Sequence, residues 1–374
     1  MPINQSRRDF LQKLSGGLGV TIASMAVPAT LVANANNNRK DAKKLGVALV
    51  GLGSYAKNQL AVALEKTSNC YLAAIVTGTP AKADEWAKKY NLDKKNIYNY
   101  QSFDEIAKNK DVDIVYVVLP NSMHKEYVIR AAKAGKHVMC EKPMSTSVKD
   151  AEDMIKACND AGVQLGIGYR MHFEPFTKEV VRLTQQKIIG DVKFIQTNFG
   201  FNIGDPTQWR LKKAMAGGGP LMDVGIYCVQ AARYVTGEEP LSVTAQYGPI
   251  TDKAVFKDVE QSLSWQLTFP GNATVNGFTS YRSNIEQLYV SATKGWIQLG
   301  PAYSYGPIKG STNEGPMNQP VVHHQTVMME EICKSFLETK KFPAHITGPE
   351  GLRDMKILMS IYEAADTGKK ISLV

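Results

Sequence analysis

The sequence predicts an α/β domain with a parallel sheet, followed by an α+β domain with a large, mainly antiparallel sheet. Three observations lead to this fold class. Between residues 44 and 169, apolar runs of strand length alternate with amphipathic stretches of helical length. A glycine-rich turn, Gly51-Leu52-Gly53, directly follows the first of these runs. Beyond Arg170 the chain changes to β-rich segments separated by turn residues. We therefore place the first domain at residues 36–168 and the second at residues 169–374.

In the first domain, the apolar runs fit strands that are covered on both faces. Gly135 and Gly162 follow two of the expected helices, where a left-handed residue commonly ends a helix. The expected strands are residues 46–50, 71–77, 113–118, 137–140 and 164–167, with helices at residues 55–66, 80–90, 125–134 and 148–161.

In the second domain, Pro270-Gly271-Asn272 lies between two β-rich segments and predicts a hairpin turn. Neighbouring strands joined in this way are antiparallel. The expected strands are residues 192–201, 241–247, 261–269, 273–280, 288–292 and 296–299, with helices at residues 173–186, 220–234, 324–337 and 350–365.

The first 35 residues have the features of a twin-arginine signal peptide. Arg7-Arg8 precedes a mildly apolar run over residues 14–32, and Ala33-Asn34-Ala35 offers a cleavage site of small residues. A membrane anchor is the alternative, because a spanning helix needs roughly 20 apolar residues. Pro28 and the many small residues favour a cleaved signal over a stable membrane span. We expect the twin-arginine translocase to export the folded protein to the periplasm.

Composition excludes several kinds of site. The net charge is +9, but the lysines are scattered, which is typical of a basic solvated surface and not of a nucleic-acid groove. The five cysteines are widely spaced and form no metal-like pair, so we expect buried thiols and no disulfides. His323-His324 are adjacent and lack the i, i+4 spacing of helical zinc ligands. No metal is expected.

A dinucleotide fingerprint follows the first strand. Gly51-Leu52-Gly53-Ser54-Tyr55-Ala56 reads Gly-x-Gly-x-x-Ala between an apolar strand and a helix. The first glycine allows the tight turn, and the second lets the backbone approach a pyrophosphate at the helix amino terminus. The motif predicts a Rossmann domain that binds a dinucleotide through residues 51 and 53–56.

The second strand ends in Thr77-Gly78-Thr79-Pro80, where an NAD-selective enzyme usually carries a carboxylate for the ribose hydroxyls. Thr77 and Thr79 can donate hydrogen bonds, and Lys82 can neutralise a 2′-phosphate. This pattern favours NADP. The alternative is that Lys82 is only a solvated helix residue.

Two later segments are expected at the same carboxyl edge of the sheet. Pro120 and Asn121 follow the strand at residues 113–118, and Asn121 is a candidate contact of the nicotinamide ribose. His124 is a further candidate there, or only a residue in the first turn of a helix. Glu141-Lys142-Pro143 ends the next strand, where the Lys142 ammonium would lie beside the nicotinamide.

A second motif reads Gly217-Gly218-Gly219-Pro220, followed by Asp223 and Tyr227 at helical i, i+4 spacing. With Glu141-Lys142-Pro143, this motif resembles the glucose-fructose oxidoreductase, inositol dehydrogenase and MocA (Gfo/Idh/MocA) family across nearly the whole mature chain. Many relatives have histidine where Tyr227 stands. The tyrosine, the export signal and two further segments resemble the glucose-fructose oxidoreductase branch, the segments being residues 138–144 and 237–240.

The resemblance implies a periplasmic sugar oxidoreductase that keeps NADP tightly bound and couples oxidation of one sugar to reduction of another. It implies that Lys142 and Tyr227 act on the sugar hydroxyl, that the Lys142 ammonium assists Tyr227 as general base, and that Asp223 orients the substrate. It also implies an open-faced second sheet and a homo-oligomer, dimer or tetramer. Candidate substrate contacts are Arg170, His172, Trp209, Arg210 and Tyr303, with Tyr305 as an alternative to Tyr303.

Two other functions stay open on the sequence. An NAD-dependent glycoside hydrolase of the same fold would use transient oxidation to loosen a glycosidic bond. A non-catalytic protein that binds a sugar or cofactor would use Asp223 only as a cap and Tyr227 only for packing.

Overall fold

The computed structural model describes residues 44–374, which form one compact unit. The expected signal peptide at residues 1–35 and the start of the expected first domain lie outside the described residues. Within residues 44–374, none of the helices combines the length and the apolar character that crossing a membrane requires.

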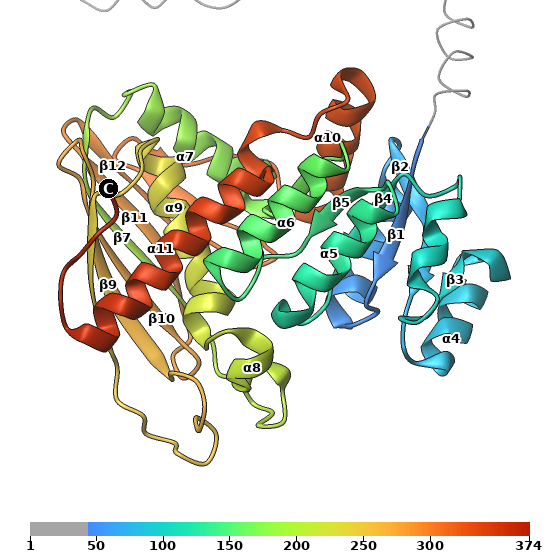
Figure 1. Cartoon of the computed structure of the whole chain (residues 1–374). Helices are drawn as coiled ribbons and strands as arrows, with labels where there is room; N and C mark the ends of the chain where they lie inside the picture. Colours follow the sequence, from blue (N-terminus) through green and yellow to red (C-terminus); the bar gives the residue numbers. More distant parts are fainter. Residues whose placement is uncertain (1–43) are drawn as a thin grey trace, which may run out of the picture. The chain divides into compact units, whose positions relative to one another are not determined.

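The first part of the unit is a six-stranded parallel sheet in the order β3-β2-β1-β4-β5-β6 (Figure 1). Its strands are β1 (Leu45–Val50), β2 (Cys70–Val76), β3 (Ile97–Tyr98), β4 (Ile114–Val117), β5 (His137–Cys140) and β6 (Leu165–Ile167). The expected strands match β1, β2, β4, β5 and β6 within two residues at each end. β3 was missed because two residues give no periodic signal.

Helices connect these strands, and their buried residues face the sheet or a neighbouring helix. The helix after β1 opens with a π-helical turn, Ala56–Leu60, before α3 (Ala61–Lys66). The others are α4 (Pro80–Tyr90), α5 (His124–Lys133) and α6 (Val148–Asp160), with short 3-10 turns at Lys94–Asn96, Phe103–Lys108 and Asn121–Met123. Gly135 and Gly162 follow α5 and α6 and have φ of +70° and +67°. They are therefore left-handed, as expected.

The second sheet has nine strands in the order β14-β13-β12-β11-β7-β10-β9-β8-β15. All its pairs are antiparallel except β7 with β10, which confirms a mainly antiparallel sheet. Its strands are β7 (Val192–Gly200), β8 (Ser242–Tyr247), β9 (Ser262–Thr268), β10 (Thr274–Ser280), β11 (Ile285–Ala292), β12 (Gly295–Leu299), β13 (Gly310–Thr312), β14 (Gly315–Pro316) and β15 (Ile371–Ser372).

The expected hairpin joins β9 to β10, and Asn272 in its turn has φ of +60°. The expected strands correspond to β7–β12. The short strands β13, β14 and β15 were not expected, because each has only two or three residues.

Helices cover one face of the second sheet, and on the opposite face the described chain places no helix (Figure 1). α11 packs against β8 of this sheet and also against α6 of the first domain. α10 packs against α3, which also belongs to the first domain. The helices are α7 (Pro175–Gln185), α8 (Lys213–Ala216), α9 (Ile226–Thr236), α10 (His324–Thr339) and α11 (Gly348–Thr367), with shorter turns at Arg170–Phe173, Trp209–Leu211, Leu221–Gly225 and Ala344–Ile346. The fold is therefore the expected parallel α/β domain followed by an open-faced α+β domain.

Candidate active site

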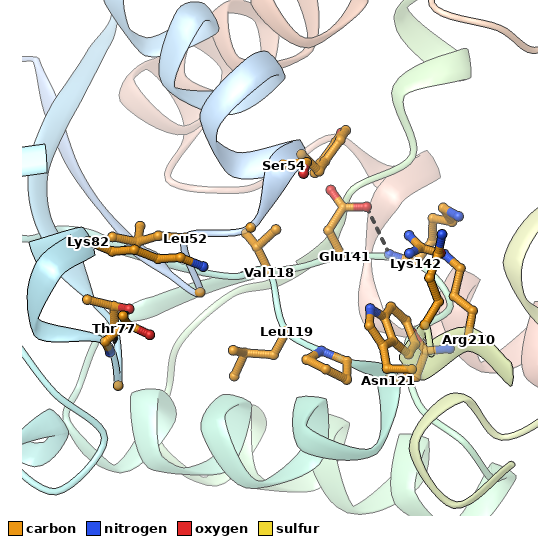
Figure 2. Close-up of a pocket in the computed structure, with 18 of the residues that line it drawn as sticks. Leu52, Ser54, Thr77, Lys82, Val118, Leu119, Asn121, Glu141, Lys142 and Arg210 are labelled. Atoms are coloured by element: carbon orange, nitrogen blue, oxygen red, sulfur yellow. Dashed lines mark hydrogen bonds between the residues drawn. The ribbon is translucent and has the colours of Figure 1, made fainter. Parts of the chain in front are cut away.

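A cavity of about 1550 Å³ lies where the parallel strands end. Residues directly after β1, β2, β4 and β5 line it, which is where open α/β sheets bind ligands. Segments of the second domain close the other side. Figure 2 shows Thr77 and Lys82 at one end, Val118 and Leu119 in the middle, and Lys142 with Arg210 at the other end. We refer to these as the threonine end and the lysine end.

The glycine turn after β1 faces this cavity. Gly51 has φ of +94°, and a Cβ there would lie 2.4 Å from the Val118 carbonyl oxygen, so the turn itself requires glycine. A Cβ at Gly53 would meet no protein atom within 4 Å. Protein packing therefore does not explain Gly53, whereas close approach of a ligand to its backbone does. Ser54 and Tyr55 also line the cavity.

Ala56, the last position of the fingerprint, is fully buried and does not line the cavity. It packs in the core beneath the turn. The expectation that Ala56 contacts the cofactor is therefore corrected: its small side chain permits close packing of the helix on the sheet.

The threonine end has no carboxylate among its lining residues. The Thr77 hydroxyl oxygen accepts a hydrogen bond from the Thr79 backbone N–H at 3.2 Å, which leaves the hydroxyl proton available. Lys82 lies in the first turn of α4, where its ammonium is exposed. The residues present fit a phosphate-bearing dinucleotide: a turn open to a pyrophosphate, hydroxyl donors and an exposed cation. Asn99, Tyr100, Gln101 and Ser102 complete this end, and no sequence pattern pointed to them.

Pro120 and Asn121 line the middle of the cavity. The Asn121 side-chain amide donates to the Ala216 carbonyl oxygen at 2.8 Å, so it also fixes the loop that leads into the three glycines. His124 is fully buried away from the cavity. Its ring nitrogens lie 2.8 and 3.0 Å from the carbonyl oxygens of Leu119 and Pro143, so its expected cofactor role is corrected to a structural one.

Glu141 lines the cavity and forms a buried pair with Tyr116, whose hydroxyl donates to Glu141 Oε1 at 2.7 Å. Burial raises the pKa of the Glu141 carboxyl above its usual range, against the effect of Tyr116 and Lys142. A Cβ at Gly168 would lie 2.5 Å from Glu141 Oε1, so this glycine makes room for the pair. Figure 2 shows the further hydrogen bond from the Lys142 backbone N–H to Glu141 Oε2, at 3.3 Å.

Lys142 and Asp223 meet across the two domains. The Lys142 ammonium donates to the Asp223 backbone carbonyl oxygen at 2.6 Å and lies 3.5 Å from Asp223 Oδ1. Arg210 Nε and the Tyr281 hydroxyl both donate to Asp223 Oδ2, at 3.0 and 3.1 Å. Burial opposes ionisation of Asp223, but the Arg210 and Lys142 cations and the Tyr281 hydrogen bond outweigh it and hold its pKa below the usual range. Asp223 is therefore an ionised anchor for two cations.

Tyr227 lies one turn further along the same helix and also lines the lysine end. The Lys142 Nζ atom stands 4.9 Å from the centroid of the Tyr227 ring, over its face. Arg170 Nε donates to the Tyr227 phenolic oxygen at 3.3 Å. The cation that contacts the phenolic oxygen is therefore Arg170, whereas the sequence indicated only Lys142.

Arg170 is 3 % exposed and pairs with no carboxylate within residues 44–374. Its Nη1 atom donates to the Ser304 carbonyl oxygen at 3.2 Å and lies 2.8 Å from His324 Nδ1, and its Nη2 atom donates to the Tyr303 carbonyl oxygen. Burial and the Arg170 charge lower the pKa of His324 to about 3, so this imidazole is neutral. These contacts hold the guanidinium beside Tyr227.

One candidate substrate contact is misplaced. His172 does not line the cavity; it lies in the 3-10 turn Arg170–Phe173, and its ring packs against Tyr234 and His345. Tyr303 does line the cavity, but its side chain is fully buried, and its hydroxyl lies 2.5 Å from the Thr197 hydroxyl within the second domain. Trp209, Arg210 and the exposed Tyr305 do line the cavity.

Glu260, which no sequence pattern indicated, supports the segment that carries Asp223 and Tyr227. Its carboxylate accepts hydrogen bonds from the Gly219 and Leu221 backbone N–H groups at 2.8 and 3.2 Å, and from the Tyr362 hydroxyl at 2.8 Å. A Cβ at Gly218 would lie 2.0 Å from the Tyr362 hydroxyl. The glycines therefore serve close packing around Glu260.

Comparisons with known proteins agree with this architecture. Residues 45–169 match the model of the oxidoreductase family with an NAD-binding Rossmann fold, and residues 177–298 match the GFO/IDH/MocA C-terminal domain. The chain is 29% identical to the D-xylose 1-dehydrogenase [NADP(+)] of Haloarcula marismortui, over 87% of this chain and 92% of that protein. It is 33% identical to the trans-1,2-dihydrobenzene-1,2-diol dehydrogenase of Xenopus laevis, over 63% of this chain and 68% of that protein.

Among solved structures, the aldose-aldose oxidoreductase of Caulobacter crescentus superposes with a TM-score of 0.85 at 41% sequence identity. The match covers 88% of this chain and 100% of that chain. The two family models match consecutive parts of the chain, and residues of both parts line the cavity. The chain belongs to the GFO/IDH/MocA family of oxidoreductases.

Proposed function

We propose that this protein is a periplasmic, NADP-dependent aldose oxidoreductase that keeps its cofactor bound and couples oxidation of one sugar to reduction of another. The observation that carries the proposal is the convergence of Lys142, Asp223 and Tyr227 at one end of a dinucleotide-sized cavity. The NADP-linked sugar dehydrogenase and the aldose-aldose oxidoreductase among the relatives support it.

The chemistry needs one proton acceptor beside the sugar. Bound NADP supplies the hydride acceptor for one sugar and, once reduced, the hydride donor for the next. As the sugar C–H gives a hydride to the bound cofactor, the adjoining O–H would give its proton to the Tyr227 oxygen in its deprotonated form, and the sugar would become a lactone. Arg170 stabilises negative charge on that oxygen, and Lys142 holds its ammonium over the same ring. Asp223, fixed by Arg210 and Tyr281, orients the sugar hydroxyls.

The proposed preference for NADP rests on the threonine end. An NAD-selective site presents a carboxylate to the ribose, and a carboxylate would repel a 2′-phosphate. Thr77 and Thr79 offer hydroxyl groups at this position, and Lys82 offers a positive charge. The same residues would bind NAD less tightly, because they include no carboxylate that could accept hydrogen bonds from both hydroxyls of its ribose.

The proposed export and cofactor retention depend on each other. Arg7-Arg8 and the apolar run behind them are an address for a translocase that carries folded proteins. A dinucleotide loaded in the cytoplasm would then travel with the enzyme, and sugar-to-sugar coupling would regenerate it without free cofactor. We also propose that the protein forms a homo-oligomer, either a dimer or a tetramer, through the open face of the second sheet.

Native mass spectrometry of the exported protein, followed by single-turnover kinetics, tests this proposal. The spectrum reports the bound nucleotide, its 2′-phosphate and the number of subunits. Addition of an aldose should then reduce the bound NADP, and a second sugar should reoxidise it. Release of free sugar from an aryl glycoside, with no net change in NADP, would instead support the glycoside hydrolase.

A further inference from the structure

The Arg210 guanidinium is fixed in place but only partly used by the protein. Its Nε atom donates to Asp223 Oδ2 at 3.0 Å, and its Cζ atom lies 4.7 Å from the centroid of the Trp209 ring. The side chain is 35% exposed and lines the cavity, beside Lys142 in Figure 2. Within residues 44–374, the structure shows no acceptor for its two terminal amino groups. A pre-oriented pair of N–H donors therefore remains for a ligand.

The other charges at the lysine end are already engaged. Arg170 uses all three of its nitrogens within the protein, and Lys142 donates to Asp223. Asp223 already accepts hydrogen bonds from Arg210, Lys142 and Tyr281. Its carboxylate therefore has little capacity left to accept from the terminal amino groups of Arg210. Within residues 44–374, Arg210 is thus the cation in this part of the cavity whose two terminal amino groups both lack a hydrogen-bond acceptor in the protein.

Two further carboxyl groups line the cavity, and neither contacts Arg210. Asp205 Oδ1 accepts from the Thr207 backbone N–H and hydroxyl at 2.8 and 2.7 Å, and no ion pair joins Asp205 to Arg210. Glu141 is buried and accepts from Tyr116 and the Lys142 backbone. Neither of these two groups competes with a ligand for the terminal amino groups of Arg210.

We infer that the terminal amino groups of Arg210 bind a carboxylate of the substrate, so that the preferred sugars are aldoses with an acid group, such as hexuronates. A planar guanidinium matches the two oxygens of a carboxylate with two parallel, charge-assisted hydrogen bonds, which neutral hydroxyls do not equal. The inference rests on the proposed function, because it names the sugar class for that same site. In this arrangement the reacting carbon of the sugar still lies beside Lys142 and Tyr227.

Three sugars that differ only at C6 provide the test: D-glucose, D-glucuronate and D-glucuronamide. The amide has nearly the shape of the carboxylate but no charge. With the purified, cofactor-loaded protein, kcat/KM for glucuronate should exceed that for glucuronamide and glucose by on the order of 10- to 100-fold. Calorimetric affinities for the three sugars should follow the same order.

Arg210→Met should remove this discrimination, leaving the three values of kcat/KM within about twofold of one another. Arg210→Lys, which keeps the charge without the planar pair of donors, should retain only part of it. Arg282→Met is the matched control, because Arg282 pairs with Asp252 and does not line the cavity. It should keep the wild-type ratio.

Equal values of kcat/KM and affinity for the three sugars in the wild type would overturn the inference. So would an Arg210→Met variant that loses the same factor with each of them, because Arg210 would then act only through Asp223. Calorimetry separates this inference from the proposed function. A protein that binds glucuronate through Arg210 but reduces NADP with none of the sugars contradicts the oxidoreductase proposal and not the carboxylate site.

Discussion

Arg170 Nε lies 3.3 Å from the phenolic oxygen of Tyr227, and Arg170 Cζ lies 5.0 Å from the centroid of the same ring. Because a guanidinium only donates, the Tyr227 oxygen is the acceptor. Negative charge on this oxygen is therefore stabilised by a buried cation that pairs with no carboxylate in the described chain. This contact makes Tyr227 the best-supported proton acceptor at the lysine end.

Tyr227→Phe should abolish most turnover and leave cofactor binding intact, because it removes only the oxygen that we propose as the proton acceptor. A loss of on the order of 10²- to 10⁴-fold in the rate of NADP reduction is expected for a general base. Single-turnover absorbance with several aldoses measures it. A variant that reacts at the wild-type rate with every aldose would show that another group accepts the proton.

Arg170→Met should slow the same step by on the order of 10- to 100-fold, the worth of a charge-assisted hydrogen bond. Arg170 also bonds the Tyr303 and Ser304 carbonyl oxygens, so part of the loss can come from a shifted loop. The double variant with Tyr227→Phe separates these effects. If Arg170 acts through the phenolic oxygen, the second substitution adds little. Independent, multiplicative losses would contradict that role.

The sequence could predict every strand of the first sheet except β3, because those strands are mostly buried apolar runs, as in β1 over Leu45–Val50. It could also predict the turn at Gly51, where both φ and space exclude a side chain. It could not predict that Arg170 and Tyr227 meet, since 57 positions separate them and no local pattern couples them. His172, two residues beyond Arg170, shows the same limit: the direction of a side chain in a 3-10 turn depends on packing.

Asp223→Asn should make the stability of the protein less dependent on acid pH. The Asp223 pKa is held below 3.8, its usual value, because Arg210 and Lys142 outweigh the effect of burial. Its stabilising contribution is therefore complete above the unfolded pKa and is lost as pH falls through the lower folded pKa. At neutral pH the substitution should cost up to about 3–5 kcal/mol, since it leaves two cations without their carboxylate.

Urea unfolding of both proteins over a pH series measures this difference. The gap between the wild type and Asp223→Asn should narrow as the pH falls below about 3.8. A gap that stays constant over the acid range would mean that folding does not lower the pKa of Asp223.

Arg7→Lys combined with Arg8→Lys should leave active, cofactor-loaded protein in the cytoplasm. In the proposed export route the paired arginines are the address that the translocase reads, and the apolar run behind them is weak. Cell fractionation with an NADP-reduction assay measures the location. Periplasmic delivery of the wild type in a strain without the twin-arginine translocase would contradict this route.

Thr77→Asp should reverse the proposed cofactor preference from NADP to NAD. The Thr77 side chain stands at the end of β2, where its oxygen accepts from the Thr79 N–H and its proton is available. A carboxylate at this position can still accept from Thr79, and it can also accept from both ribose hydroxyls. It would repel a 2′-phosphate, so NADP affinity should fall by on the order of 10- to 100-fold while NAD affinity rises.

Lys82→Ala is the control: it should weaken NADP binding without improving NAD binding, because it removes a cation and adds no acceptor. Calorimetric titration of nucleotide-free protein with each cofactor gives the two ratios, and a wild type that binds NAD as tightly as NADP would refute the assignment.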